Sequence, residues 1–192
     1  LLAAMPSLPS RFIYVSSTSV LADSAGAWVN EDTEAKPETA TAALLHEGEK
    51  LALANGALVL RFAGIYGPKR LWLLRAARQD SLRCHFDPPQ WTNRIHEYDC
   101  IGALQHLLQR GFNTGVLHAV DDEPAPRYEV LKWLREQLHL SPIAIESAVG
   151  SVQEQGKRVS NQALRATGWR PHYPSYREGY LAILRELDSS KS

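Results

Sequence analysis

A strand–helix–strand order near the start of the sequence most constrains what this chain can fold into. Residues 11–16 (RFIYVS) form a short apolar and aromatic run, which is typical of a strand buried on both faces. A helix is predicted to begin near Thr39 and to end at Asn55-Gly56. In a second apolar run, residues 57–67, a buried strand is predicted to end at Gly64, with a turn at residues 66–68. Such a unit is nearly always right-handed with parallel strands, so the sequence predicts the α/β class.

Four hydroxyl-bearing residues stand where the first predicted strand ends: Ser16, Ser17, Thr18 and Ser19. Ligands bind at the carboxyl ends of strands in open parallel sheets, so these side chains are candidates for lining a ligand site. The alternative is that their hydroxyls only satisfy backbone groups at the strand end and in turns.

The rest of the chain continues the alternation of helices and strands. Periodicity predicts helices at residues 70–79, 97–111, 127–138, 161–169 and 175–187, and strands at 115–122 and 143–149. The second of these helices follows an extended stretch at residue 94. Its predicted apolar face carries Ile101, Leu104, Leu107 and Leu108.

The composition is that of an ordinary globular protein, with 44% apolar and 22% charged residues. Because 21 Lys and Arg balance 21 Asp and Glu, no bulk charge favours nucleic acid or an anionic membrane as a partner. No apolar run approaches the roughly 18 residues of a membrane-spanning helix. Two cysteines, Cys84 and Cys100, do not make a disulfide framework, which favours the reducing cytoplasm.

Four motifs occur in one order along the chain: FIYVSSTSV, LRFAGIYGP, RIHEYDC and KRVSNQALRATGWRPHYPSYREGY. In this order they resemble the extended short-chain dehydrogenase/reductases, the NAD-dependent epimerase/dehydratase family, and within it an atypical, sugar-nucleotide epimerase-like branch. The resemblance implies a Rossmann-type parallel sheet with a small C-terminal substrate lobe. It implies that residues 1–68 are the remainder of the NAD(P)-binding domain, and that 69–192 are mainly substrate lobe, with 95–121 returning to the sheet.

The glycine-rich turn that cradles the dinucleotide pyrophosphate in this family is absent. No two of the twelve glycines are two residues apart, so the sequence contains no G-x-G. The family pattern implies that an opening portion of about 100 residues is missing ahead of Leu1. We therefore expect an N-terminally truncated fold, completed by the missing half or by a homo-oligomer.

The resemblance also implies a Tyr-x-x-x-Lys pair that works with a serine or threonine in proton transfer. Ser17 matches the catalytic hydroxyl of the family. Judged from Glu49, the tyrosine and lysine positions hold Thr41 and Leu45, neither of which loses a proton near neutral pH. We expect an NAD(P)-dependent oxidoreductase or epimerase/dehydratase relative for a small polar or nucleotide-sugar-like substrate, inactive or incomplete as this chain. The alternative is a non-catalytic module that binds a dinucleotide, a metabolite or a partner.

Candidate binding residues follow from the same resemblance. NAD or NADP is expected to contact Ser16, Ser17, Phe62, Ala63, Gly64 and Ile65. A small-molecule substrate is expected to contact Thr18, Ser19, Thr92 and Arg94. For Arg94, phosphate binding and a structural ion pair both stay open. His96 and Asp99 are expected to secure the junction between strand and helix.

Four other patterns have a plain structural interpretation beside a functional one. Tyr128 and Lys132 spell Tyr-x-x-x-Lys, but Tyr128 lies on the apolar stripe of a later helix, which favours a core role. Cys84, His85, His96 and Cys100 match no familiar zinc spacing, and the resemblance implies no metal. No G-x-S-x-G elbow supports a hydrolase built on Ser17. Trp28, Trp72 and Trp91 lie in loop or short-helix regions where they can border a pocket.

Overall fold

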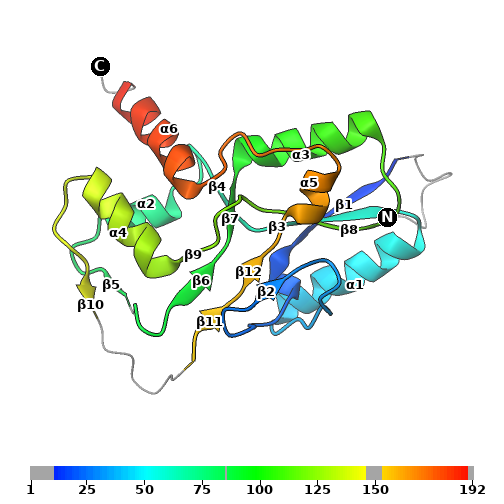
Figure 1. The fold of residues 1–192 in the computed structure, drawn as a ribbon, viewed down its shortest axis with the longest axis horizontal. Helices are drawn as coiled ribbons and strands as arrows, with labels where there is room; N and C mark the ends of the chain where they lie inside the picture. The colour runs from blue at the N-terminus through cyan, green and yellow to red at the C-terminus, as the bar shows by residue number, and fades with distance from the viewer. Residues whose placement is uncertain (1–10, 85, 146–152, 190–192) are drawn as a thin grey trace.

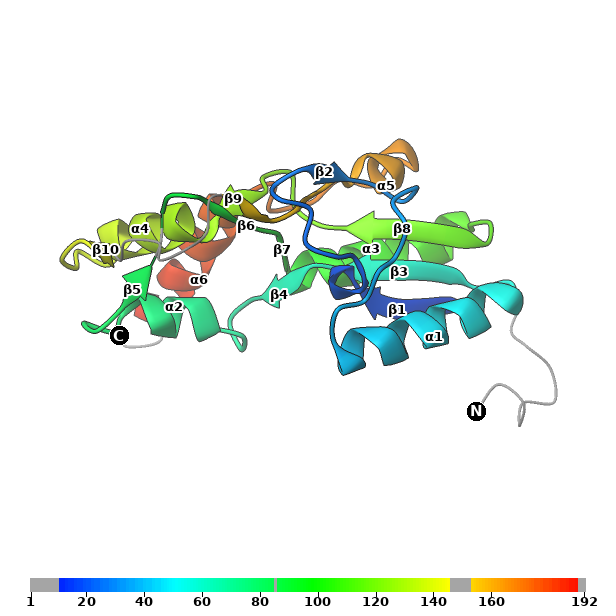
Figure 2. The same ribbon diagram turned by 90° about the horizontal axis from the view of Figure 1, so that it is seen from below.

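The computed structural model describes residues 11–84, 86–145 and 153–189. Its centre is a three-stranded parallel sheet in the order β1-β3-β8. The strands are β1 (Ile13–Ser17), β3 (Leu58–Phe62) and β8 (Gly115–Ala119). Helices α1 (Ala40–Ala54) and α3 (Glu97–Arg110) cover its opposite faces (Figures 1 and 2). The α/β class and the parallel strand–helix–strand unit are confirmed.

The predicted ends of α1 are also confirmed, and each has a local cause. The side chain of Thr39 accepts a hydrogen bond from the backbone N–H of Ala42, which satisfies a donor that the first turn leaves free. At the other end Gly56 has a φ of 75°, a left-handed conformation that glycine adopts without steric cost.

Strand β3 shows how the two faces of the sheet are built. Leu58, Leu60 and Phe62 belong to the apolar cluster under α3. Arg61, between them, points to the other face and pairs with Glu49 of α1. Successive side chains of a strand alternate between faces, so this buried strand serves both helices.

Strand β1 corrects one prediction. It was expected to be buried on both faces, but Val15 is 50% exposed and only Ser16 of its five residues is buried. The reason is that β1 lies at the edge of the sheet, and within the described ranges only β3 pairs with it.

The second strand ends two residues earlier than the predicted end at Gly64, and a further strand reaches into the predicted turn. β3 ends at Phe62, and Gly64–Tyr66 forms a separate strand, β4, which pairs in parallel with β7 (Arg94–His96). The N–H of Gly64 donates to the carbonyl of Asn93, so the chain leaves the main sheet at Ala63.

The apolar face predicted for α3 is partly wrong. Ile101 and Leu108 are 54% and 45% exposed, whereas Cys100, Ala103 and Leu107 are buried. These three follow the i, i+3, i+7 spacing of one helix face, and that face rests on the sheet.

A second core lies among helices α2 (Trp72–Ala77), α4 (Arg127–Gln137) and α6 (Tyr176–Ser189), on the left of Figure 1. The remaining short strands pair with one another outside the main sheet: β5 (Arg83–Cys84) with β10 (Ala144–Ile145), β6 (Gln90–Thr92) with β9 (Ala125–Pro126) and β11 (Gln155–Gly156), and β12 (Arg158–Val159) with β2 (Trp28–Val29). The chain also contains a short 3-10 helix, η2 (Thr18–Val20), and helix α5 (Gln162–Ala166). The division into two domains at residue 68 stays a prediction.

Two predictions reach beyond the described residues. The strand predicted at 143–149 is present as β10 up to residue 145, and 146–149 lie outside the described ranges, as does His85. In the part of the chain that the structure describes, no helix is both long and apolar enough to cross a membrane.

Candidate functional site

The four strand-end hydroxyls have different surroundings. Ser17 caps η2, and its Oγ accepts a hydrogen bond from the N–H of Ser19 at 3.1 Å. Ser16 and Thr18 are buried, and Ser19 is exposed. At least one of the hydroxyls therefore has the structural role that the alternative interpretation assigned to them. Their contact with a ligand stays a prediction.

The positions expected for the catalytic pair lie on α1, close to this strand end. Thr41 is exposed. Leu45 is half-buried and packs against an apolar cluster that includes Val20, Ala63 and Val120. An aliphatic side chain thus occupies the place where a lysine charge would be needed, and no proton can be exchanged there.

The four residues expected to contact a nicotinamide differ in burial. Phe62 and Ala63 are buried in the cores on either side of the sheet. Gly64 is exposed and Ile65 is half-buried, just beyond the end of β3. A Cβ at Gly64 would lie 3.2 Å from the carbonyl oxygen of Asn93, so this position is tight. Contact of these four residues with a nicotinamide stays a prediction, and the sequence has no G-x-G turn for the pyrophosphate of a dinucleotide.

A cavity of about 150 Å³ opens where β4 and β7 meet the lobe. Its polar lining comes from Thr92, Asn93, Arg94 and Arg127. Its apolar lining comes from Gly64, Tyr66, Trp72, Leu73 and Tyr180. The structure thus brings together three of the predicted binding residues, Gly64, Thr92 and Arg94, with Trp72.

Strand pairing explains why these side chains meet. Gly64 is the direct partner of Arg94 across β4 and β7. Thr92 lies opposite Ala125 in the antiparallel pair of β6 and β9, and its hydroxyl donates to the Ala125 carbonyl at 2.8 Å. Because α4 begins directly after β9, this pairing brings Arg127 to the cavity.

Arg94 is a buried cation without a matched anion. Its side chain is 5% exposed, one terminal nitrogen donates to the hydroxyl of Thr92, and the other has no hydrogen-bond partner in the described residues. No ion pair joins it to a carboxylate in the described ranges. Burial raises the pKa of the nearby Asp121 well above its usual range, although the charge of Arg94 acts to lower it. The Asp121 carboxyl is itself buried, and its Oδ2 has no hydrogen-bond partner in the described residues.

Sequence reasoning missed Arg127, Tyr66 and Tyr180. Arg127 is half-buried at the first position of α4, and its Nε is buried with no hydrogen-bond partner in the described part of the chain. The only signal in the sequence is a basic residue directly after Ala125-Pro126, at a predicted helix start. Tyr66 and Tyr180 stack with ring centroids 4.5 Å apart.

His96 and Asp99 act as expected at the start of α3, and Asp99 also has a longer reach. The Nδ1 of His96 accepts from the N–H of Tyr98 at 3.1 Å. The carboxylate of Asp99 accepts from the N–H groups of His172 and Tyr173, which ties α3 to the segment before α6. Burial lowers the pKa of His96 to about 4.

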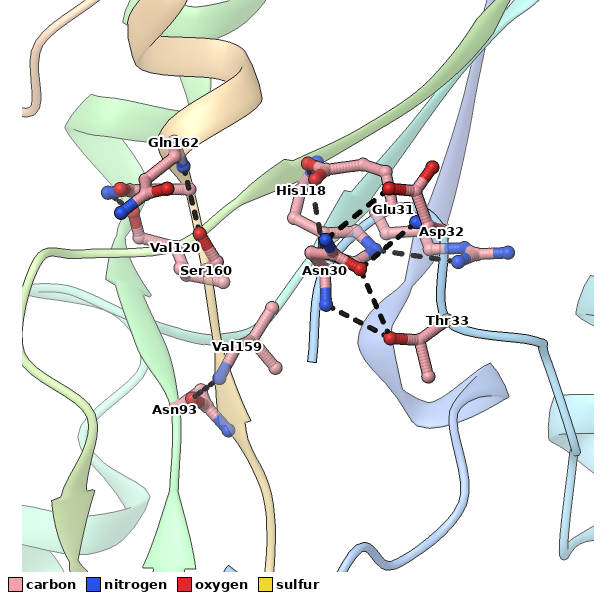
Figure 3. A network of polar contacts seen from close by, with 12 residues as sticks. Asn30, Glu31, Asp32, Thr33, Asn93, His118, Val120, Val159, Ser160 and Gln162 are labelled. Atoms are coloured by element: carbon pink, nitrogen blue, oxygen red, sulfur yellow. Dashed lines mark hydrogen bonds and ion pairs between the residues drawn. The ribbon is translucent and has the colours of Figure 1, made fainter. Parts of the chain in front are cut away.

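Polar contacts also hold the loops around the strand ends (Figure 3). The carboxylate of Glu31 accepts from the backbone N–H of His118 at 2.8 Å. The Asn93 amide accepts from the N–H of Val159 and donates to the carbonyl of Lys157, each at 2.8 Å. Both polar groups of Asn93 are therefore engaged, and they fix the backbone next to Arg94.

The remaining sequence candidates lie in structural positions. Tyr128 packs against the core of the lobe, as predicted, and Lys132 is exposed. Cys84 and Cys100 are buried, and they belong to different core clusters. Trp28 is exposed and lies over the guanidinium of Arg158, and it borders a second cavity together with Asp121 and Asp122, as predicted for a pocket-lining tryptophan.

Comparison with known proteins agrees with this architecture. A solved NAD-dependent epimerase/dehydratase from Methylobacillus flagellatus is 32% identical, with a TM-score of 0.78 over 92% of this chain. A conserved protein of unknown function from Silicibacter pomeroyi is 29% identical, with a TM-score of 0.79 over 91% of the chain. The 3-diazoavenalumate denitrifying reductase of a Streptomyces species is 28% identical over 158 residues, 73% of this chain. No protein-family model matches the sequence.

The parallel sheet and the attached helical lobe define a Rossmann-type α/β protein. In sequence and in fold the chain resembles the NAD-dependent epimerase/dehydratase family of short-chain dehydrogenase/reductases, as the four motifs indicate. It spans 64% and 66% of the two solved structures and about half (52%) of the reductase. More distant structures of the same fold were solved with NAD or NADPH.

Proposed function

We propose that this chain forms the substrate side of an NAD(P)-dependent site and binds the anionic group of a small polar substrate. The observation that carries the proposal is the pair of arginines at the cavity. Arg94 and Arg127 each have a buried guanidinium nitrogen without a hydrogen-bond partner in the described residues. Leaving such groups unsatisfied is costly, and a carboxylate or phosphate would satisfy both.

The electrostatics favour an anion over a neutral ligand. Arg94 brings a buried positive charge to the cavity, and no ion pair joins it to a carboxylate in the described residues. An anion in the cavity would supply the missing negative charge in a place where water screens little.

The nicotinamide end of the site would be formed by Ser17, Gly64 and Ile65. A reduced nicotinamide dinucleotide, when bound, would supply a hydride to a substrate in the cavity. Gly64 also lines the cavity, so substrate and nicotinamide would meet at this residue.

The chain's own residues supply no proton relay of the usual kind. Thr41 and Leu45 do not titrate, and Leu45 is part of an apolar cluster. Two functions are compatible with this. One is binding without turnover, and the other is a reduction that needs no proton from a tyrosine. Similarity to a reductase that acts on a diazo compound favours the second.

Two titrations test the proposal. Tryptophan-to-nicotinamide energy transfer should show saturable binding of NADPH or NADH. Calorimetry with inorganic phosphate should show binding that Arg127→Gln weakens about tenfold or more, the scale of one hydrogen bond to a charged group. Lys132→Gln, an exposed change on the same helix, serves as the control. A flat phosphate titration would contradict the proposed anion site.

A further inference from the structure

We propose that the cavity selects a single aromatic ring bearing a carboxylate, and that it does not take the nucleotide-linked sugar that the family resemblance implies. This substrate class rests on the proposed function, because it occupies the same two-arginine cavity. Size, the apolar wall and the unsatisfied donors each point to it independently.

The size of the cavity sets the first limit. Sites for drug-sized ligands span about 300–1,000 Å³, whereas this cavity holds about 150 Å³. An engineered apolar cavity of about 150 Å³ in another protein accommodates one benzene molecule. One ring and a small substituent therefore fit, and a nucleoside diphosphate does not.

The apolar wall matches an aromatic ring. Tyr66 and Tyr180 both line the cavity, and their rings are stacked at an interplanar angle of 27°. Leu73 is buried beside them, and the indole of Trp72 borders the same space. A third ring can pack on such a wall in an offset or edge-on arrangement, which contributes about 0.5–1.5 kcal/mol beyond area burial.

The polar lining matches a carboxylate and not a polyol. Sugar hydroxyls need both donors and acceptors, but the amide of Asn93 is engaged by backbone groups on both sides. The hydroxyl of Thr92 donates to the Ala125 carbonyl. The groups left over are guanidinium nitrogens of Arg94 and Arg127, which are donors only, and the hydroxyl of Tyr180, which can also donate to a carboxylate.

The hydroxyl of Tyr66 does not add an acceptor to the cavity. It lies against Gly179 of α6, because a Cβ built at that glycine would collide with it. The ring of Tyr66 faces the cavity and its polar end points into the packing of the lobe. One cationic end and one aromatic wall thus define an amphipathic ligand, an aryl carboxylate.

Calorimetry on the intact chain tests this with four probes: benzoate, cyclohexanecarboxylate, acetate and UDP-glucose. We expect benzoate to bind at least tenfold more tightly than acetate and more tightly than cyclohexanecarboxylate, and UDP-glucose not to compete with benzoate. Equal affinity for benzoate and acetate, or competitive binding of UDP-glucose, would overturn the inference and leave the proposed anion site standing. Failure of benzoate, acetate and phosphate alike would overturn the proposed function itself.

A matched pair of tryptophan variants separates the ring from the charge. Trp72 and Trp28 are 57% and 58% exposed, so neither replacement by alanine removes a core side chain. Trp72→Ala should weaken benzoate binding about threefold to tenfold and leave inorganic phosphate binding unchanged, since the lost contact is apolar. Trp28→Ala should change neither. If Trp72→Ala leaves benzoate affinity intact, the aromatic wall does not hold the ligand.

Discussion

The carboxylate of Glu49 and the guanidinium of Arg61 form a two-point ion pair between α1 and β3, with N–O distances of 2.8 and 2.7 Å. The two side chains are 1% and 5% exposed. Burial acts to raise the pKa of Glu49, but the hydrogen bonds and charge of Arg61 outweigh it, and the pKa lies below its usual value. The pair is therefore a carboxylate matched by a guanidinium, and it fixes the position of α1 on the sheet.

Breaking this pair from one side should be costly. Arg61→Met leaves the Glu49 carboxylate buried without its partner, and we expect the free energy of unfolding at pH 7 to fall by about 3–5 kcal/mol. The double variant Glu49→Leu/Arg61→Met removes both charges and should be more stable than Arg61→Met. Urea unfolding followed by circular dichroism measures both values. A double variant less stable than the single one would show that the pair itself, and not the stranded charge, supplies the stability.

His118 predicts a dependence of stability on pH. Burial lowers its pKa to about 4, and Arg61, whose Nη1 lies 3.4 Å from its Nε2, acts in the same direction. Since Arg61 can only donate, Nε2 accepts and the ring is neutral. The unfolded chain binds the proton at higher pH, near 6.5, so stability rises with pH between about 4 and 6.5 and is fully present above that range.

The measurement is the free energy of unfolding at several pH values between 4 and 7. Each unit between folded and unfolded pKa corresponds to about 1.4 kcal/mol. His118→Gln should reduce the dependence of the unfolding free energy on pH without abolishing it. The pKa of His96 is also lowered to about 4, so His96 still contributes to that dependence in the variant. Identical slopes for the variant and the natural chain would rule out His118 as the source.

The sequence was most informative where local rules decide. Thr39 and Gly56 mark the ends of α1 by capping and by left-handed backbone, which depend on neighbouring residues alone. The exposure of Val15 depends on whether another strand pairs with β1, and apolar composition does not report that.

The candidate site was predictable only in part, for a similar reason. Thr92 and Arg94 were found through a motif, but Arg127 reaches the cavity through the pairing of β6 with β9, more than thirty residues apart in sequence. Tyr180 lies on the last helix, α6, where its position in the apolar pattern is that of an ordinary core residue. Contacts that depend on tertiary packing leave no periodic signal in the sequence.

The catalytic positions on α1 predict a contrast between neighbours. Leu45 is half-buried in an apolar cluster, so Leu45→Lys should lower the free energy of unfolding by about 1–3 kcal/mol. Leu44 is 75% exposed, and Leu44→Lys should stay within about 0.5 kcal/mol of the natural chain. Thermal unfolding of the two variants side by side gives the comparison. Equal stability of the two variants would contradict the apolar packing of Leu45.

Two helix glycines predict opposite responses to one methyl group. Replacing glycine by alanine in a helix interior normally stabilises by about 0.5–1 kcal/mol, and Gly102→Ala on α3 should do so because its nearest neighbour would be 3.8 Å away. Gly179→Ala on α6 should instead destabilise by about 1–3 kcal/mol, since the new Cβ would collide with the hydroxyl of Tyr66. Adding Tyr66→Phe removes the colliding oxygen and should recover part of the lost stability. The rest should not be recovered, because a ring carbon of residue 66 would still lie 2.8 Å from the new Cβ. Guanidinium unfolding of the three variants decides the case, and a Gly179→Ala chain as stable as Gly102→Ala would show that the Tyr66 ring is free to move away from α6.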